Sequence, residues 1–246
     1  MCLGLTPLSP ALRKLVVVLA ALFAFPCSSR ATVIVSVTDL GVPGNRAAFF
    51  LGGEFSNTVA VSWTQANSFS GVSIDASLVS IDPSFDTGTA YLMRSIGPGT
   101  TPASEVVPPA SFTAPIINLL FEEVPLTVLF SGLTLDAGPY FLVLTAPFAD
   151  IMGSPLTWQI ATEPEIITTT GVTIGNTNEA NTLNTTVDPF APASTFLVDF
   201  VDRPLFDVVS NIPEPQTAVL LLTFVAVLIL GMRRTSHDRE SKPAGL

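Results

Sequence analysis

The stretch TVAVSWT, residues 58–64, alternates large apolar side chains with small or polar ones. Val59, Val61 and Trp63 therefore share one face of an extended chain, because successive side chains of a β-strand point to opposite faces. A period of two is typical of a strand that is buried on one side. The same pattern recurs in Val72, Ile74, Ala76 and Leu78; in Leu126, Val128 and Phe130; in Leu156, Trp158 and Ile160; and in Phe196, Val198 and Phe200.

We expect residues 32–211 to form a single all-β domain. Residues 139–145 are more continuously apolar, which indicates a strand that is buried on both faces or central in its sheet. Clusters of Gly, Pro, Asn and Asp separate the strand-like segments, and no stretch shows a helical period. Short strands at this spacing favour an antiparallel sandwich or barrel. We predict a two-sheet, jelly-roll-like sandwich whose least ordered parts are Pro98–Ala110 and Gly175–Pro192.

One segment is echoed later in the domain. Residues 69–76, FSGVSIDA, recur as residues 130–137, FSGLTLDA, with five identical and three conservative positions. Each segment fits a strand with a glycine kink and a polar outer face. The echo follows either from sheet geometry or from duplication, and its spacing of 61 residues is too long for a solenoid.

The first 31 residues have the organisation of a secretory signal peptide. A basic pair precedes the apolar stretch 15–25, and a small-x-small site ends at Ala31. We predict cleavage between Ala31 and Thr32. Cys27 raises the alternative of a lipoprotein, although Phe25-Pro26 stands where a lipobox has small residues.

The C-terminal region joins three elements in a fixed order. Pro213-Glu214-Pro215 comes first, an uncharged apolar run at 217–232 follows, and Arg233-Arg234 comes last. A helix over this run measures roughly 24 Å, and the arginine stems extend its reach toward a bilayer core of about 30 Å. We predict a transmembrane helix rather than a buried core helix, because the run lacks a polar face. The basic residues place the tail, 235–246, in the cytoplasm and residues 32–211 outside.

These three elements resemble the PEP-CTERM sorting signal of Gram-negative, exopolysaccharide-producing bacteria. In that family a Pro-Glu-Pro tripeptide, a short transmembrane helix and an arginine-rich cluster hand an exported protein to an exosortase. Pro213-Glu214-Pro215 matches the tripeptide and Arg233-Arg234 matches the cluster, within residues 212–234. Unlike the family pattern, the chain continues past the arginines to Leu246. The resemblance implies an exosortase-like membrane enzyme as partner, passage through the inner membrane, and delivery to the envelope or the extracellular matrix.

The exported region is strongly acidic. Residues 32–211 contain three arginines and seventeen acidic residues, which gives a formal charge of −14. Such a surface repels nucleic acid and anionic lipid, because phosphate binding needs Lys and Arg, so we expect no nucleic-acid partner. The region contains no Cys, His or Lys, which excludes disulfides, Ser-His-Asp triads, Cys-His pairs, Schiff bases and histidine-rich zinc sites. Only carboxylate chemistry remains.

Few residues are candidates for binding a ligand. Trp63 and Trp158 could stack on sugar rings, but both are in phase with apolar neighbours, which favours positions in the core. Glu122 and Glu123 are adjacent, so in a strand they point to opposite faces and cannot converge on one glycosidic bond. We expect this pair to mark a strand end or a turn.

A calcium site is an alternative role for the acidic loops. Asp82, Asp86 and the pair Asp75/Asp136 could contribute ligands to Ca²⁺. No EF-hand spacing is present, so solvated acidic loops are the default and we predict neither a metal nor another cofactor.

The leading hypothesis is an exported, non-enzymatic protein of the bacterial cell surface or extracellular matrix, sorted as the resemblance implies. Three alternatives remain open. A carbohydrate-binding module for exopolysaccharide needs an exposed Trp or Tyr. A carboxylate-dependent glycosidase needs a cleft with two carboxylates about 5–10 Å apart. A membrane-anchored ectodomain would never be processed.

Overall fold

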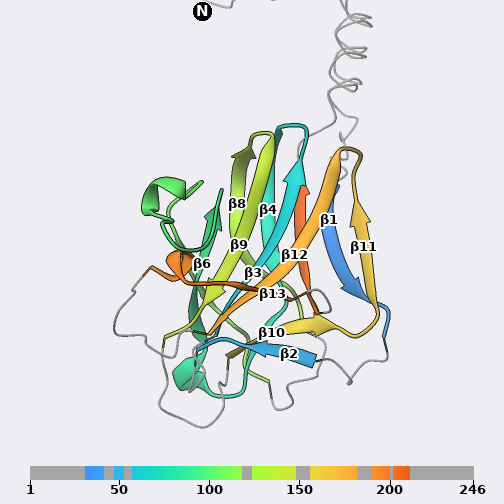
Figure 1. Ribbon diagram of the computed structural model, residues 1–246. Coiled ribbons are helices and arrows are strands. Elements are labelled where there is room, and N and C mark those ends of the chain that lie inside the picture. Colours follow the sequence, from blue (N-terminus) through green and yellow to red (C-terminus); the bar gives the residue numbers. More distant parts are fainter. Residues whose placement is uncertain are drawn as a thin grey trace, which may run out of the picture. The chain divides into compact units, whose positions relative to one another are not determined.

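Three antiparallel sheets make up the part of the chain that the structure describes (Figure 1). The computed structural model describes residues 31–41, 47–52, 57–117, 124–147, 156–181, 190–199 and 202–210. All of these belong to one unit, Ala31–Ile212. The all-β prediction is confirmed for these ranges, whose only helical elements are the 3-10 turns η1 (Pro83–Phe85), η2 (Pro102–Ser104) and η3 (Ala191–Ala193).

Sheets A and C are large and sheet B is small. Sheet A runs in the order β11 (Pro164–Thr168), β1 (Thr32–Asp39), β15 (Phe206–Ser210), β4 (Phe69–Ala76), β8 (Thr127–Leu135). Sheet C runs in the order β13 (Leu197–Asp199), β12 (Val172–Asn181), β3 (Asn57–Gln65), β9 (Gly138–Thr145), β6 (Thr87–Met93), β7 (Ala110–Thr113). Sheet B contains β14 (Arg203–Pro204), β10 (Leu156–Ala161) and β2 (Ala47–Phe50), and β5 (Leu78–Ser80) also pairs with β10.

The main hydrophobic core lies between sheets A and C. Trp63 of β3 stacks on Tyr140 of β9 with 5.3 Å between ring centroids. It also packs against Phe206 of β15, in the facing sheet, at 6.2 Å. Val59 and Val61 point into the same core as Trp63, so the alternation of residues 58–64 is confirmed. The predicted sandwich-like packing is present.

Sheet B is a third sheet, which the predicted two-sheet sandwich does not include. The alternating set at residues 156–160 predicts one polar face, but all six residues of β10 are buried. Gln159 accepts a hydrogen bond from Ser77 Oγ at 2.7 Å inside the fold. Buried polar side chains of this kind are tolerated when they are paired. An alternating sequence therefore does not distinguish a strand that is covered on both faces from a strand that is exposed on one face.

The last of the described strands, β15, lies in the middle of sheet A. It pairs with β1 on one side and with β4 on the other. Leu205, directly before it, donates its N–H to the carbonyl of Gln159 at 2.9 Å and accepts from the N–H of Ser77 at 3.0 Å. The segment 203–210 thereby connects sheets A and B, and its Phe206 reaches the core face of sheet C.

β9 is a central strand with both faces covered, as its apolar run predicts. Alternate residues from Tyr140 to Leu144 point into the main core. Val143 points the other way, into a second cluster against which Phe190 and Phe196 pack. The segment around η3 therefore covers the outer face of sheet C at this strand.

The two echoed segments lie side by side as β4 and β8. They pair antiparallel, with Ile74 opposite Phe130, and the register shifts close to both glycines. Gly71 and Gly132 have φ values of +62° and +69°. A positive φ at a bulged position favours glycine, which lacks the Cβ that would clash. The predicted glycine kinks are confirmed as β-bulges.

Two expectations are wrong. Leu126 and Val128 are 39% and 61% exposed although Phe130 is buried, because the irregular register of β8 reverses its phase. Neither segment expected to be poorly ordered is so where it is described. Pro98–Ala110 contains η2, and its Val106 N–H donates to the carbonyl of Leu92 at 2.8 Å. Within Gly175–Pro192, residues 175–181 belong to β12, which pairs with β3. Both differences come from contacts with neighbouring strands rather than from local sequence.

The terminal signals lie outside the described residues. These residues do not include positions 1–30, Pro213-Glu214-Pro215, the apolar run 217–232 or Arg233-Arg234, nor Glu122-Glu123. Among the residues that the structure does describe, no helix has the length and apolar character needed to cross a membrane.

Candidate functional site

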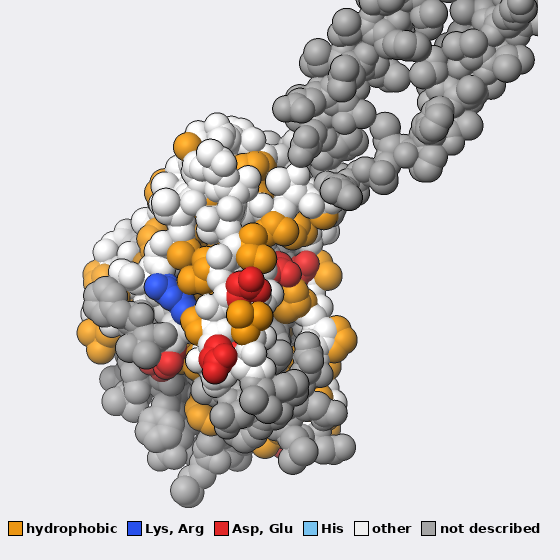
Figure 2. All heavy atoms as spheres, turned by 90° about the vertical axis from the view of Figure 1, so that its right-hand side faces the viewer, with side chains coloured by type: hydrophobic (Ala, Val, Ile, Leu, Met, Phe, Trp, Pro, Cys, Tyr) orange, Lys and Arg blue, Asp and Glu red, His pale blue; other side chains and the backbone are white. Residues whose placement is uncertain are grey.

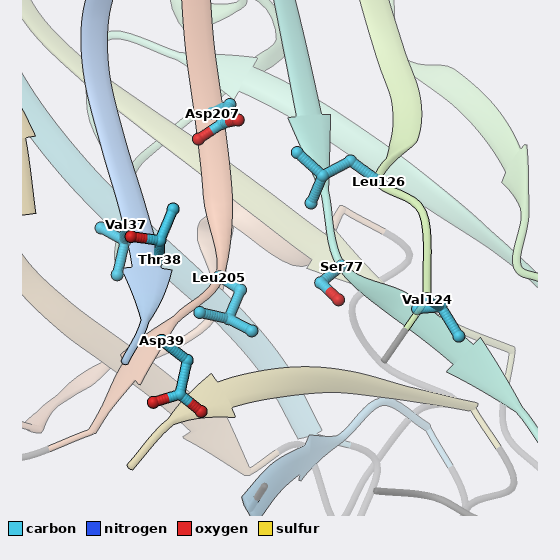
Figure 3. A pocket seen from close by; sticks show the side chains of 8 residues that line it. All are labelled: Val37, Thr38, Asp39, Ser77, Val124, Leu126, Leu205 and Asp207. Atoms are coloured by element: carbon cyan, nitrogen blue, oxygen red, sulfur yellow. The ribbon is translucent and has the colours of Figure 1, made fainter. Parts of the chain in front are cut away.

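A pocket of about 180 Å³ lies beside the end of β1 (Figure 3). Four separate parts of the chain form it: the end of β1, Ser77 directly after β4, the segment that leads into β8, and the start of β15 with the residue before it. Its lining consists of Val37, Thr38, Asp39, Ser77, Val124, Leu126, Leu205 and Asp207. In Figure 3, Val124 and Leu126 lie across the pocket from Thr38 and Asp39. Carboxylates and hydroxyls thus face an aliphatic wall.

Asp39 is held by the backbone of the turn that follows β10. Its Oδ1 accepts hydrogen bonds from the N–H groups of Thr162 at 3.1 Å and Glu163 at 2.9 Å. The N–H of Gly41 donates to the same oxygen at 3.0 Å. Charge-assisted bonds from several backbone donors fix a carboxylate in place. Asp39 therefore ties the end of β1 to the β10–β11 turn.

Two further carboxylates lie side by side on the outer face of sheet A. Asp207 of β15 is directly paired with Asp75 of β4, and paired residues have Cβ atoms about 4.5–5.5 Å apart. Each carboxylate accepts a hydrogen bond from a serine, Asp207 from Ser36 at 2.5 Å and Asp75 from Ser73 at 2.9 Å. Burial raises the pKa of Asp75, the Ser73 hydrogen bond opposes this shift, and the charge of Asp207 adds to it.

Only one member of this carboxylate pair lines the pocket. Both carboxylates of a glycosidase must reach the glycosidic bond that lies between them. Asp75 and Asp207 project from the same face of one sheet, and only Asp207 lines the pocket.

The acidic residues considered for calcium are not brought together. Asp82 and Asp86 flank η1, where Asp82 accepts the N–H of Ser84 at 2.8 Å and so caps the turn. Asp75 lies near one end of the β4–β8 pair, and Asp136 follows the opposite end. Among the residues with described positions, no group of three or more Asp, Glu, His or Cys side chains is placed to hold a metal ion.

Neither tryptophan offers a face to a ligand. Trp63 and Trp158 are 1% and 0% exposed, so the core positions favoured by their apolar phase are confirmed and the stacking role is wrong. Each indole N–H is paired inside the protein, that of Trp63 with Gln65 Oε1 at 3.2 Å and that of Trp158 with the Leu205 carbonyl at 2.9 Å. Tyr140 is also fully buried.

A buried glutamine that the sequence analysis does not single out links the two large sheets. Gln65 ends β3 in sheet C and is 1% exposed. Its Nε2 donates to the carbonyls of Leu135 at 3.1 Å and Asp136 at 3.3 Å, at the end of β8 in sheet A. The sequence does mark this position by its spacing, because Gln65 follows Val59, Val61 and Trp63 at the same interval of two residues. A polar residue at an inward position must find partners there.

The folded region begins and ends next to the predicted processing positions. Thr32 is the first residue of β1, directly after the expected cleavage at Ala31. Ser210 is the last residue of β15, three positions before Pro213. Thr32 and Ser210 are paired, so both ends of the folded region lie at the same end of sheet A.

Comparison of the chain with protein-family models and with curated proteins finds no match to either.

Proposed function

We propose that this chain is an exported bacterial protein whose non-catalytic, jelly-roll-like sandwich is sorted by an exosortase-like enzyme to the cell surface or the extracellular matrix. The proposal is carried by the order of Pro213-Glu214-Pro215, the apolar run 217–232 and Arg233-Arg234. Each part has a physical role. The prolines stop the helix upstream, the apolar run partitions into lipid, and the arginines keep the tail in the cytoplasm.

The bounds of the folded region support this proposal. Cleavage between Ala31 and Thr32 leaves β1 whole, and cleavage near Pro213 leaves β15 whole. Both processing events therefore spare every described strand. A domain that keeps its complete fold after two cleavages is suited to life outside the membrane.

The hydrogen bonds that the carboxylates accept within the fold support a non-catalytic role. Asp39 is engaged by three backbone N–H groups, and Asp207 accepts a hydrogen bond from Ser36. Residues 32–211 contain no Cys, His or Lys that could act as a nucleophile or a base beside them. We expect the domain to act through its surface.

Mass spectrometry of the secreted protein tests the proposal because it reports both ends at once. We expect an N-terminus at Thr32 and a C-terminus close to Pro213. A mature protein that still carries residues 217–232 would instead indicate an anchored ectodomain that is not processed.

A variant that combines Glu214→Ala with Arg233→Ala and Arg234→Ala tests the sorting step itself. We expect this variant to stay in the inner membrane. A matched control, Arg239→Ala with Glu240→Ala, changes charges beyond the motif and should be released like the wild type. Unchanged release of the motif variant would refute sorting.

The pocket beside β1 favours a second candidate function, the binding of an exopolysaccharide. Its carboxylates and hydroxyls can pair with sugar hydroxyls, and Leu126 supplies an apolar wall. Asp207→Ala is expected to weaken polysaccharide binding, whereas the control Asp82→Ala, at η1, leaves it unchanged. Equal binding by both variants would remove this candidate.

A further inference from the structure

Strand β11 forms one edge of sheet A and is open on one side. Among the described strands it pairs with β1 alone (Figure 1). All of its residues are exposed, and they include Ile166 and Ile167 at 40% and 45%. An edge strand presents backbone N–H and C=O groups to which another extended chain can bind as an added strand.

Two backbone hydrogen bonds determine which groups of β11 face away from β1. The N–H of Leu40 donates to the carbonyl of Glu163 at 3.0 Å. At the other end, the N–H of Thr169 donates to the carbonyl of Ile34 at 3.1 Å. Bonding alternates along an antiparallel pair, so the odd-numbered residues from 163 to 169 bond to β1 and the even-numbered residues face away.

The groups that face away are three carbonyls and two N–H groups. They belong to Pro164, Ile166 and Thr168, of which proline has no N–H to offer. No described strand pairs with this side of β11. A guest strand could therefore form a short antiparallel ladder here, which is more stable per residue than a parallel one.

The other edges of the described sheets are less suited to such pairing. The register of β11 with β1 runs without a shift over the whole strand, whereas β8, at the opposite edge of sheet A, has three register shifts. The edge strands of sheet C, β13 and β7, have only three and four residues. Short and irregular edges resist the addition of a strand, so β11 is the most accessible of these edges.

The open edge is acidic. Glu163 and Glu165 are two positions apart, so their side chains lie on one face of the strand together with that of Ile167. Asp39 of β1 lies at the same end. The two arginines with described positions donate to backbone carbonyls elsewhere. Figure 2 views the domain from this side and shows acidic and hydrophobic side chains next to one another.

Charge complementarity distinguishes a second copy of the chain from a different partner. Two β11 strands paired with each other would bring Glu163 and Glu165 of both copies together on one face, and like charges on neighbouring strands are destabilising. A guest with Lys or Arg opposite both glutamates gains cross-strand ion pairs instead. An apolar guest residue opposite Ile167 would also cover exposed apolar surface.

We propose that the open edge of β11 binds an extended, basic segment of another protein as an additional antiparallel strand of sheet A. The guest carries the pattern apolar-x-basic-x-basic. Its apolar residue lies opposite Ile167, and its basic residues lie opposite Glu165 and Glu163. This site lies in the described domain and depends neither on the proposed sorting nor on the pocket beside β1.

Fluorescence anisotropy of labelled peptides, added to the purified full-length protein in a non-ionic detergent, tests the site. The probe is Thr-Val-Ile-Val-Arg-Thr-Arg, whose residues lie opposite positions 169 to 163 in that order. A second peptide has Glu in place of both Arg residues. A third is N-methylated at its second Val, whose N–H would otherwise donate to the carbonyl of Ile166.

We expect the probe to bind about tenfold more tightly than either of the other peptides. Equal binding of the N-methylated peptide would overturn the proposal, because the probe would then be held by general electrostatic attraction and not by the backbone. Equal binding of the glutamate peptide would overturn the choice of a basic partner.

Two variants at one position test the edge from the side of the protein. Ile166→Pro removes an N–H that faces away from β1 and should weaken binding of the probe about tenfold. The control Ile166→Thr keeps the N–H and the strand propensity and should stay within about threefold of the wild type. Unchanged binding by the proline variant would refute the site, provided that the fluorescence of the two buried tryptophans shows it to be folded. Self-association of the protein alone, abolished by Ile166→Pro, would overturn the proposed partner in favour of a second copy.

Discussion

Replacement of Gln65 by glutamate tests the contact that joins the two large sheets. The Nε2 group donates to the carbonyls of Leu135 and Asp136, and Oε1 accepts from Trp63. Glutamate has almost the same shape, but its ionised form only accepts hydrogen bonds. Nε2 also donates to the carbonyl of Asn67 at 3.1 Å, so the substitution places an oxygen against three carbonyl oxygens without leaving a cavity.

The expected loss of stability depends on pH. A protonated glutamic acid keeps one O–H donor, so near pH 4 the loss of a buried hydrogen bond costs about 2 kcal/mol. At pH 7 the buried carboxyl must either ionise or stay protonated far above the ordinary glutamate pKa of about 4.3. This adds roughly 3 kcal/mol to the loss of stability. Burial raises the pKa of the new carboxyl in the folded state. The stability of the variant, relative to wild type, therefore falls as the pH rises from about 4 toward that raised pKa.

Urea unfolding followed by tryptophan fluorescence measures this effect, because Trp63 and Trp158 are both buried. The wild type and the variant are compared at each pH, so that other titrating groups cancel. Gln65→Leu is the control, since it removes the same hydrogen bonds without adding an ionisable group and should lose similar stability at pH 4 and pH 7. A glutamate variant with equal losses at both pH values would refute the reasoning, because its side chain would then be in contact with water.

Substitutions at three further positions probe sheet A. Asp75→Asn should stabilise the protein at pH 7 by less than about 1 kcal/mol, since the group is half-exposed and screened. The raised pKa of Asp75 means that the wild type loses stability as the pH rises above about 3.8. Urea titrations should therefore show no gain of the variant over the wild type below that pH. Gly132→Ala should lower the free energy of unfolding by about 1–2 kcal/mol and Gly132→Asn by less. A Cβ at this position meets no other atom, so the cost comes from the φ of +69°, which asparagine tolerates better than alanine. Equal shifts in Tm for the two variants would contradict this. Asp39→Ala should cost about 1–2 kcal/mol and speed amide exchange at Thr162, whereas unchanged exchange would show that the cap does not hold the turn.

Strand identity could be predicted wherever one face of a strand determines the pattern. Val59, Val61 and Trp63 alternate in the sequence and share the main core in the structure. The continuous run of β9 correctly indicates a central strand, since its outward residue Val143 is covered as well. In these places local periodicity and tertiary packing agree.

The phase of β8 and the third sheet could not be predicted in this way. The irregular pairing of β8 reverses the direction of Val128 relative to Phe130, and no residue type marks that shift. The polar residues of β10 are buried because their partners, such as Ser77 for Gln159, come from distant segments. Periodicity contains no information about such partners.

The candidate site depends even more on long-range pairing. Asp75 and Asp207 are 132 positions apart, and only the insertion of β15 beside β4 brings them together. The pocket likewise collects residues from β1, β15 and the approach to β8. By contrast, the proposed sorting signal is contiguous, so it can be found in the sequence without a fold.

β15 is the last of the described strands and yet lies in the middle of sheet A, so sheet A cannot close until this strand is present. Without residues 203–210, β1 and β4 each present an unpaired edge, and nothing occupies the place of Phe206 opposite Trp63. In the export that we propose, a chain whose last strand has not yet been made would therefore enter a translocation channel without a closed sandwich. We expect a chain ending at residue 202 to be digested by protease and one ending at residue 211 to resist, whereas equal resistance would show that the sheet closes without its final strand.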